Sequence, residues 1–255
     1  MDLQSCHAVV SGGASGLGAA TAAAIVHAGG KATLLDRDRD RGSAKAMELG
    51  SAARFRAADV TDEADIAAAV KDAIDGFGPI TLAVSCAGIA TPGRILGRNG
   101  PLALDSYKTV IMVNLVGSFN LLKAAANHMQ HNSADADGCR GVVVNTASVA
   151  AYEGQVGQAA YASSKGGIVG LTLPAARDLA QFGIRVMTIA PGLFLTPMMR
   201  SLPDDVQNAL GASVPFPKRL GAPEEYADLV KTIYLNNMLN GCTIRLDGAL
   251  RLAPR

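Results

Sequence analysis

Three side chains in the second half of the sequence have the types and the spacing that suit proton transfer to an alcohol or carbonyl group. Tyr161 and Lys165 are four residues apart in a segment of helical period, so they share one helix face. A free phenol has a pKa near ~10, and a buried ammonium beside it is the kind of neighbour that lowers this pKa. Ser148, which follows a short apolar run, is expected to form a hydrogen bond with the substrate oxygen.

Asn114 is a fourth candidate, because it lies inside the long apolar-periodic segment 104–129. A polar amide in such a segment needs a partner. It is expected either to bond to a backbone carbonyl or to anchor a water that carries protons from Lys165 to solvent. A lone asparagine in the middle of a helix is usually a satisfied surface amide, but the neighbouring candidates favour a role in the site.

A glycine-rich turn follows the first apolar run and opens the first helical segment. Gly12, Gly16 and Gly18 form the pattern G-x-x-x-G-x-G. Glycines there permit positive φ and close backbone approach, so the free N–H groups of the helix N-terminus can face a pyrophosphate. A plain tight turn between a strand and a helix uses glycine too, so this motif gains its meaning from the residues that follow it.

Asp36 strengthens the interpretation, because it ends the second apolar run eighteen residues after Gly18. An acid at about this distance accepts hydrogen bonds from the adenosine ribose and repels a 2′-phosphate, which favours NAD over NADP. Arg37 partly offsets this repulsion, whereas Ser15 is not the basic residue that would clamp a phosphate. The alternative is a solvated turn aspartate that begins the charged run 36–40.

Polar and small residues follow the next two apolar runs. Asp59 and Val60 come after the third run, and Cys86, Ala87 and Gly88 come after the fourth. Open α/β sheets bind their ligands at the carboxyl ends of strands, so these residues are expected to line one edge with the glycine-rich turn. Each also has a structural explanation, since an aspartate can cap a helix and small residues suit a turn.

The alternation of short apolar runs with alanine-rich segments of helical period predicts the fold that positions these residues. Strands separated by helices form β-α-β units, which build a parallel sheet with helices on both faces. We therefore predict one α/β domain over residues 1–255, with a single-domain, Rossmann-like, doubly wound sheet of seven parallel strands. The expected strands are 6–10, 31–35, 54–57, 80–85, 141–146, 185–189 and 243–246, and the expected helices are 17–28, 41–49, 63–75, 104–129 and 161–181.

Three segments interrupt the alternation. Residues 91–101 and 132–140 are rich in Gly, Asn, Asp and Pro and are expected to be surface loops. Residues 193–220 combine four prolines with Phe, Leu and Met. An apolar excursion of this kind after a strand is a candidate lid over a substrate site, and a plain loop that covers the core is the equal alternative.

Composition limits the partners of the chain. With 23 Lys+Arg against 22 Asp+Glu the net charge is +1, so no basic field for nucleic acid is expected. The first residues do not form a signal peptide, and polar residues break the long uncharged stretches, so no membrane partner is expected. The widely spaced Cys6, Cys86, Cys139 and Cys242 are expected to be reduced, which indicates the cytoplasm, or the mitochondrial matrix if the source is eukaryotic.

A metal site is not predicted. His128 and His131 are three residues apart near a helix end, and the sequence offers no third ligand beside them. Histidines at this position are expected to interact with the dipole at the carboxyl end of the helix instead.

Together these residues make the chain resemble the short-chain dehydrogenase/reductase family over essentially its whole length. A Ser/Tyr/Lys set in this order with the cofactor motifs is very specific. Within the family, residues 145–151, 154–161, 185–194 and 214–217 are similar to the type II 3-hydroxyacyl-CoA dehydrogenases, the subfamily also described as 17β-hydroxysteroid dehydrogenase type 10. The matching family motifs are Gly12, Gly16, Gly18, Asp59, Ala87, Gly88, Asn114, Ser148, Tyr161, Lys165, Pro191 and Gly192.

The resemblance implies an NAD-dependent oxidoreductase that interconverts 3-hydroxyacyl-CoA, including 2-methyl-3-hydroxyacyl-CoA, and 3-ketoacyl-CoA by hydride transfer. It also implies a homotetramer built on the helices that hold Asn114 and Tyr161. The implied catalytic residues are Asn114, Ser148, Tyr161 and Lys165, and the implied substrate contacts are Ser148, Gln155, Gln158 and Tyr161. The implied cofactor contacts are Gly12, Ser15, Gly16, Leu17, Gly18, Asp36, Asp59, Val60, Cys86, Ala87, Gly88, Tyr161, Lys165, Pro191, Gly192, Phe194 and Thr196.

Two alternatives stay open at the level of sequence. One is a short-chain dehydrogenase for another secondary alcohol, such as a hydroxysteroid or a 3-ketoacyl thioester of acyl carrier protein. The other is a non-catalytic scaffold of the same fold, which would show a degraded catalytic set and a basic surface. The chain departs from the subfamily in the loops 89–108 and 132–138 and at Arg37, so substrate breadth and strict NAD preference are the open points.

Overall fold

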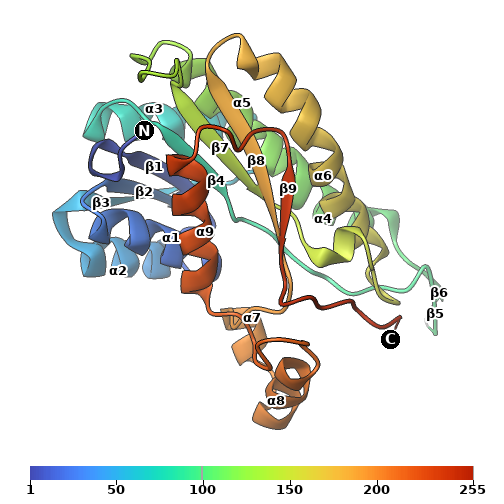
Figure 1. The fold of residues 1–255 in the computed structure, drawn as a ribbon. Coiled ribbons are helices and arrows are strands. Elements are labelled where there is room, and N and C mark those ends of the chain that lie inside the picture. Colours follow the sequence, from blue (N-terminus) through green and yellow to red (C-terminus); the bar gives the residue numbers. More distant parts are fainter. Residues whose placement is uncertain (99, 255) are drawn as a thin grey trace.

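A central parallel sheet organises the protein in the computed structural model, which describes residues 1–98 and 100–254. Residue 99 of the predicted loop 91–101 and residue 255 of the predicted domain lie outside this description. The sheet has seven strands, as predicted, and they lie in the order β3-β2-β1-β4-β7-β8-β9 (Figure 1). Its strands are β1 (His7–Ser11), β2 (Lys31–Asp36), β3 (Ala53–Ala57), β4 (Leu82–Ser85), β7 (Gly141–Thr146), β8 (Ile184–Pro191) and β9 (Thr243–Leu246).

The central strands are buried on both faces. Every residue of β1, β4, β7 and β8 is buried, and valine dominates these runs. Parallel strands covered by helices on both sides have this continuous apolar pattern, because neither face meets water. The strand order reverses between β1 and β4, so the connections after β1 and β4 leave in opposite directions. A crevice at their carboxyl ends follows from this reversal.

Helices cover both faces of the sheet (Figure 1). Helices α1, α2 and α9 lie on one face, where α1 packs on α9, and α3, α5 and α6 lie on the other, where α3 packs on α5. The helices are α1 (Gly16–His27), α2 (Arg39–Leu49), α3 (Glu63–Phe77), α4 (Leu104–Ile111), α5 (Gly117–Met129), α6 (Ala159–Ala180) and α9 (Pro223–Leu235).

The predicted helix 104–129 is continuous but not uniform. Its two α-helical halves, α4 and α5, are joined by a π-helical turn, η3, at Met112–Val116. By length and composition alone these 26 residues suffice to cross a membrane, but half of their most apolar window is buried inside the protein. The helix packs against α3, α6 and the sheet, so it is a core element of this fold.

Five helices and strands in the described part of the chain were not predicted. Helix α9 was missed, and the 193–220 segment contains two short helices, α7 (Pro197–Arg200) and α8 (Asp204–Ala212). The 91–101 segment carries a two-stranded ribbon of β5 (Leu96–Gly97) and β6 (Gly100–Pro101), where a plain loop was expected. Both excursions project beyond the carboxyl edge of the sheet in Figure 1. The smaller turns are η1 (Leu3–Ser5), η2 (Gly50–Ala52) and η4 (Val149–Ala151), and 132–140 is a loop as predicted.

His7, at the start of β1, is expected to make the free energy of unfolding decrease at acid pH. Its side chain is 2% exposed, with Nδ1 2.9 Å from Gly78 O and Nε2 3.0 Å from Thr33 Oγ1. Burial lowers the pKa of His7 to about 4, despite the opposing hydrogen bond to Gly78. Between pH 6.5 and 4 the unfolded chain therefore binds a proton that the folded chain does not. The free energy of unfolding should fall by roughly 3 kcal/mol as pH drops through this window.

Urea unfolding of the wild type and of His7→Gln at pH 7 and pH 4.5 measures this effect. The loss of stability between the two pH values should be smaller in His7→Gln, because glutamine does not titrate. His131→Gln, at an exposed histidine, is the matched control and should follow the wild type. Equal pH dependence in His7→Gln and the wild type would show that His7 does not control the acid response.

Candidate active site

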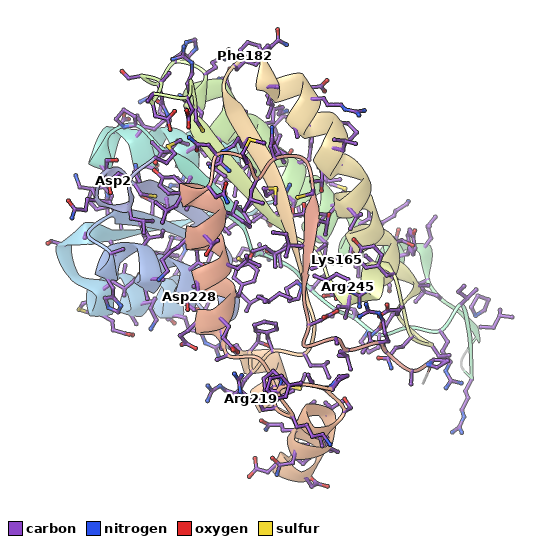
Figure 2. The ribbon with its side chains drawn as sticks, viewed as in Figure 1. Asp2, Lys165, Phe182, Arg219, Asp228 and Arg245 are labelled. Atoms are coloured by element: carbon purple, nitrogen blue, oxygen red, sulfur yellow. The ribbon has the colours of Figure 1, made fainter. Side chains whose placement is uncertain are left out.

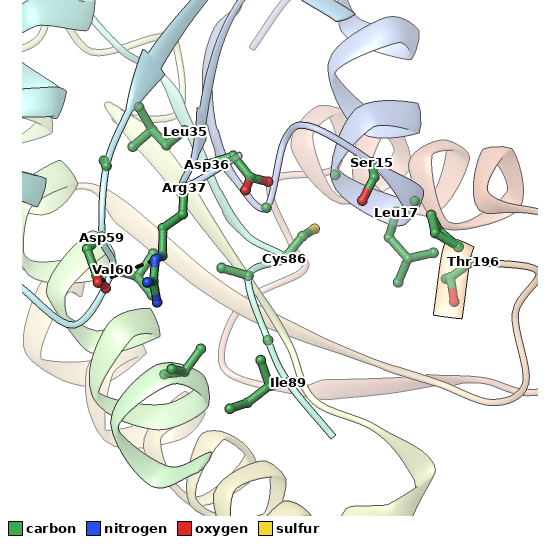
Figure 3. Close-up of a pocket in the computed structure, with 18 residues that line it drawn as sticks. Ser15, Leu17, Leu35, Asp36, Arg37, Asp59, Val60, Cys86, Ile89 and Thr196 are labelled. Atoms are coloured by element: carbon green, nitrogen blue, oxygen red, sulfur yellow. Dashed lines mark ion pairs between the residues drawn. The ribbon is translucent and has the colours of Figure 1, made fainter. Parts of the chain in front are cut away.

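A cavity of about 400 Å³ opens at the carboxyl ends of β1, β2 and β4 (Figure 3). Figure 3 shows that its walls come from the glycine-rich turn, the end of β2 and the loops after β3 and β4. Twelve of the residues predicted at the cofactor line this one cavity. They are Gly12, Ser15, Gly16, Leu17, Gly18, Asp36, Asp59, Val60, Cys86, Ala87, Gly88 and Thr196.

The backbone of the turn between β1 and α1 is packed so closely that only glycine fits at two of its positions. This leaves backbone N–H groups uncovered for a pyrophosphate. A Cβ on Gly12 would lie 2.7 Å from Ala87 N, and a Cβ on Gly18 would lie 2.3 Å from Gly12 O. Gly12 and Gly16 also have positive φ values of 66° and 54°. Ser15 is the N-cap of α1 and makes no side-chain capping bond, so the first N–H groups of the helix can bind an anion.

Asp36 is held at the pocket by the backbone. Its carboxylate accepts hydrogen bonds from the N–H groups of Ala14 and Asp38, both at 3.1 Å. One carboxylate oxygen is thus tied to the glycine-rich turn itself. This fixed position beside the turn is that of an acid that receives ribose hydroxyls, so the structure supports the functional interpretation over a freely solvated turn residue.

Arg37 points away from Asp36 toward the next strand. Its Nε lies 3.6 Å from Asp59 Oδ2, and Figure 3 shows this ion pair across the pocket. Hydrogen bonds from Thr61, with a smaller contribution from Arg37, keep the pKa of Asp59 below its usual value. Asp59 is therefore a partner that competes with a phosphate for Arg37, although the pair is too exposed to be strong.

A second cavity of about 290 Å³ continues the first one toward β7 and β8. The two share Leu17, Cys86, Gly88, Ile89 and Thr196 in their walls, so they form one cleft. The remaining predicted residues that line it are Ser148, Gln155, Gln158, Tyr161, Lys165, Pro191, Gly192 and Phe194. The structure thus gathers the expected cofactor and substrate contacts at one sheet edge.

Ser148 and Tyr161 face each other in this second cavity. Ser148 is the N-cap of η4, and its Oγ accepts a hydrogen bond from Ala150 N at 3.1 Å. Burial raises the pKa of Tyr161, and the hydrogen bond with Ser148 opposes this rise. In the chain by itself, desolvation of the phenolate therefore outweighs the hydrogen bond.

Lys165 is fixed one helical turn after Tyr161. Its Nζ donates a hydrogen bond to Thr146 O at 2.7 Å and lies 5.7 Å from the centre of the Tyr161 ring. The side chain is 4% exposed, and burial lowers the pKa of Lys165 to about 8. The ammonium form still predominates at neutral pH, so Lys165 supplies positive charge next to the phenol.

Asn114 lies in the π-helical turn and is completely buried. Its side chain bonds both backbone groups of Ile89, accepting from N at 2.8 Å and donating to O at 3.0 Å. It also donates to Ser164 Oγ at 2.9 Å. The expected bond to a backbone carbonyl is confirmed, and the Asn114 side chain holds the loop segment that follows Gly88 in place. Asn114 supports the cleft from behind instead of lining it.

Sequence reasoning missed one wall of the catalytic cavity. Leu252, from the segment after β9, lines it. Salt bridges to Glu153 from Arg245 in β9 and from Arg251 in this segment hold both against the loop after η4. These residues form no recognisable motif, and their proximity depends on the placement of β9 at the edge of the sheet.

Comparison with known proteins agrees with this geometry. The family model described as short chain dehydrogenase matches residues 6–207. The chain belongs to this family. Short-chain dehydrogenases are oxidoreductases with a nicotinamide cofactor, and the cleft is the candidate active site of this chain. The scaffold alternative predicted a degraded catalytic set, whereas the Ser148, Tyr161 and Lys165 set of this short-chain dehydrogenase is intact.

Several relatives of this short-chain dehydrogenase are named 3-hydroxyacyl-CoA dehydrogenase type-2. The human 3-hydroxyacyl-CoA dehydrogenase type-2 is 54% identical over 97% of this chain and 95% of its own length. The protein of the same name from Drosophila melanogaster is 51% identical, with 96% and 97% covered. The crystal structure of 3-hydroxyacyl-CoA dehydrogenase type-2 from Mycobacterium avium superposes with a TM-score of 0.95 at 40% identity and covers 99% of this chain and 98% of that one.

Proposed function

We propose that this enzyme is an NAD-dependent 3-hydroxyacyl-CoA dehydrogenase that interconverts 3-hydroxyacyl-CoA, including 2-methyl-branched forms, and 3-ketoacyl-CoA. The observation that carries the proposal is the position of Ser148, Tyr161 and Lys165 in a largely apolar cavity continuous with the Asp36 pocket. The names of the relatives point to the same substrate class.

The chemistry of this chain follows from the three side chains. Tyr161 takes the hydroxyl proton in oxidation and returns it in reduction. Ser148 donates a hydrogen bond to the substrate oxygen and so fixes it beside the phenol. Lys165 adds positive charge at Tyr161 and reaches the cofactor ribose. A bound nicotinamide supplies hydride transfer, and its oxidised ring adds the further positive charge that favours the phenolate.

The choice of NAD rests on the carboxylate of Asp36. Its two backbone hydrogen bonds hold this carboxylate beside the space that the adenosine ribose of a dinucleotide on the glycine-rich turn would fill. A 2′-phosphate would bring negative charge against this carboxylate, and Ser15 offers no positive charge in return. Arg37 lies on the Asp59 side of the pocket, where it offsets the repulsion only in part.

The substrate end of the cavity suits an acyl chain. Among the residues that the structure describes, Lys165 is the one charged residue in the lining, and the 193–220 segment contributes Leu193, Phe194 and Met199. This segment therefore fits the role of a substrate-covering lid. Gln155 and Gln158 also line the cavity and offer amide groups to the thioester carbonyl.

The carrier part of the substrate has basic candidates outside the cavity. Arg94 lines a neighbouring cavity of about 350 Å³, which shares Gln155 and Gln158 with the catalytic one. Arg94, with Arg98 four residues later in the same exposed segment, is the candidate for contacts with the phosphates of coenzyme A. Arg219 is less suitable, because Glu225 already holds its guanidinium with two bonds of 2.8 Å.

The active form is proposed to be a homotetramer in the cytoplasm, or in the mitochondrial matrix if the source is eukaryotic. Helix α5 exposes Phe119, α6 exposes Leu173 and the turn after α6 exposes Phe182, each more than a third accessible. A groove of about 360 Å³ runs between the two helices. A second copy of this chain would cover these apolar side chains. Neither nucleic acid nor a membrane is proposed as a partner, in keeping with the net charge of +1.

A substrate panel tests the activity. Acetoacetyl-CoA, a ketosteroid, a keto sugar and an acyl-carrier-protein thioester are compared as oxidants of NADH under matched conditions. We expect acetoacetyl-CoA to be among the best substrates, with weaker activity on the ketosteroid. If the CoA thioester is among the poorest, the assigned substrate class is wrong and only the short-chain dehydrogenase chemistry stands.

A further inference from the structure

The segment 247–254, which follows β9, borders the substrate end of the catalytic cavity. Its residue Leu252 lines the cavity together with the catalytic side chains and is only partly exposed. The Gln155 side-chain amide and the Val156 backbone N–H donate hydrogen bonds to carbonyl oxygens of the segment, at 2.9 and 3.1 Å. The segment is therefore bonded to the loop that carries the two predicted substrate glutamines.

The same segment also contacts the 193–220 lid. The backbone N–H of Phe216 donates to Gly248 O at 3.3 Å. Gly248 has a φ of 58°, and a Cβ there would lie 2.6 Å from a methyl group of Val214. Residues 247–254 thus connect two walls of the cavity that are far apart in sequence, and their position bears on the shape of the substrate site.

A cluster of four charged residues holds the segment in place. Arg245, which Figure 2 labels, donates to both oxygens of Glu153 at 2.8 and 3.0 Å and to Asp247 at 2.7 Å. Arg251 also pairs with Glu153 at 3.3 Å and with Asp247 at 3.2 Å. The Asp247 side chain is only 8% exposed. Two cations and two anions in a partly buried site compensate each other more strongly than exposed pairs.

The cluster acts on Leu252 through a direct contact. The backbone N–H of Leu252 lies 3.4 Å from Glu153 Oε2, the carboxylate that Arg245 also binds. A second anchor precedes Leu252 along the chain, since Arg245 donates to Leu250 O at 3.0 Å. The charged groups therefore fix the backbone on the N-terminal side of the side chain that enters the cavity.

We propose that Leu252 is a specificity-determining residue for the acyl group, and that Glu153, Arg245, Asp247 and Arg251 are positioning residues that hold it against the substrate. The acyl part of this inference rests on the proposed function. Leu252 forms part of the wall of this cavity, so its size limits the space for the acyl chain. Its fixed backbone keeps that limit sharp.

Replacing Leu252 by a smaller or a larger side chain tests its proposed role in acyl-chain specificity. The measured quantity is kcat/KM for 3-ketooctanoyl-CoA divided by kcat/KM for acetoacetyl-CoA. Leu252→Ala should raise this ratio by at least about tenfold, and Leu252→Phe should lower it, because a methylene of pocket space discriminates by ~10-fold or more. Leu235→Ala, at a half-exposed leucine of α9, is the control and should leave the ratio unchanged. An unchanged ratio in both Leu252 variants would overturn the proposal.

Removing one charge tests the positioning. Glu153→Gln keeps the shape of the side chain and should raise KM for the acyl substrate several-fold, with little change in kcat or in KM for NADH. Glu153→Gln alone should also raise the chain-length ratio, because it loosens the backbone that holds Leu252. Added to Leu252→Ala, it should cause no further change in this ratio, because the side chain that it positions is already removed. Glu48→Gln, in the exposed Lys45–Glu48 pair, is the matched control. Independent, multiplicative effects on the ratio would contradict a shared action.

The failure of the substrate assignment gives a different result from the failure of this inference. If CoA thioesters are poor substrates, the same variants are measured with NADH on a short and a long aliphatic ketone, each of which is reduced to a secondary alcohol. A change of the length ratio with the size of residue 252 would then support the wall while the CoA assignment fails. No change with either substrate class would refute the role of Leu252.

Discussion

Tyr161→Phe is expected to lower kcat by about 10³-fold while the variant still binds NAD, because the change removes only the hydroxyl that transfers the proton. The ring remains in its partly buried place beside Ser148 and Lys165, so the fold should be kept. Stopped-flow or steady-state turnover of acetoacetyl-CoA and fluorescence titration with NADH measure the two properties separately. Tyr152→Phe, at a half-exposed tyrosine, is the control.

A second variant distinguishes the proton-transfer role from the charge role. Lys165→Ala should lower kcat and also weaken NADH binding, because Lys165 both supplies charge to the phenol and reaches the cofactor. It also leaves Thr146 O without its hydrogen bond of 2.7 Å, so its thermal stability must be checked. Near-normal turnover of a correctly folded Tyr161→Phe protein would show that another group transfers the proton.

Asp36→Ala is expected to narrow the ratio of kcat/KM for NAD over NADP, chiefly by improving NADP. In the wild type this ratio should exceed tenfold, which corresponds to about 1.4 kcal/mol of discrimination. The alanine variant loses the repulsion of the 2′-phosphate and frees the Ala14 N–H, which then becomes a donor for a phosphate oxygen.

The control for this experiment is Asp40→Ala, which removes an exposed acid from the first turn of α2. Its cofactor ratio should match that of the wild type, since Asp40 does not line the pocket. Equal use of the two cofactors by the wild type would refute the proposed NAD preference. An unchanged ratio in Asp36→Ala would assign the discrimination to another residue.

The sheet could be predicted because its strands are local patterns. Runs such as 82–85 and 141–146 are buried on both faces, so they consist mainly of apolar residues and are bounded by turn residues. The motif residues of the cleft were predictable for a related reason. They follow directly on strands whose carboxyl ends must meet at one edge, so their sequence positions already imply their proximity.

The missed helices show where prolines were misread. Pro197 is the first residue of α7, Pro203 is the N-cap of α8, and Pro223 is the first residue of α9. Proline is favoured at the start of a helix, where its missing N–H costs no hydrogen bond. For α9 the acidic pair Glu224 and Glu225 in the first turn was an additional indication that the sequence offered.

The contacts of Leu252 could not be predicted in the same way. They require the strand β9 to lie beside β8, which brings Arg245 within reach of Glu153, 92 residues away in sequence. No spacing rule encodes such a pair, since it depends on the completed sheet. The same is true of Asn114, whose two bonds to Ile89 depend on a local change of helix type that its sequence pattern does not indicate.

That change of helix type separates α4 from α5, so the faces of the two halves are no longer related by regular α-helical spacing. An α-helix turns by about 100° per residue, so the wider π-helical turn at Met112–Val116 shifts the angular phase of everything after it. Residues of α4 and α5 with helical spacing therefore do not form one continuous stripe. A deletion of a single residue in the turn would keep the composition and helicity of the segment, yet rotate α5 relative to Asn114. Grafts and chimaeras of this helix must preserve its length as strictly as its residues.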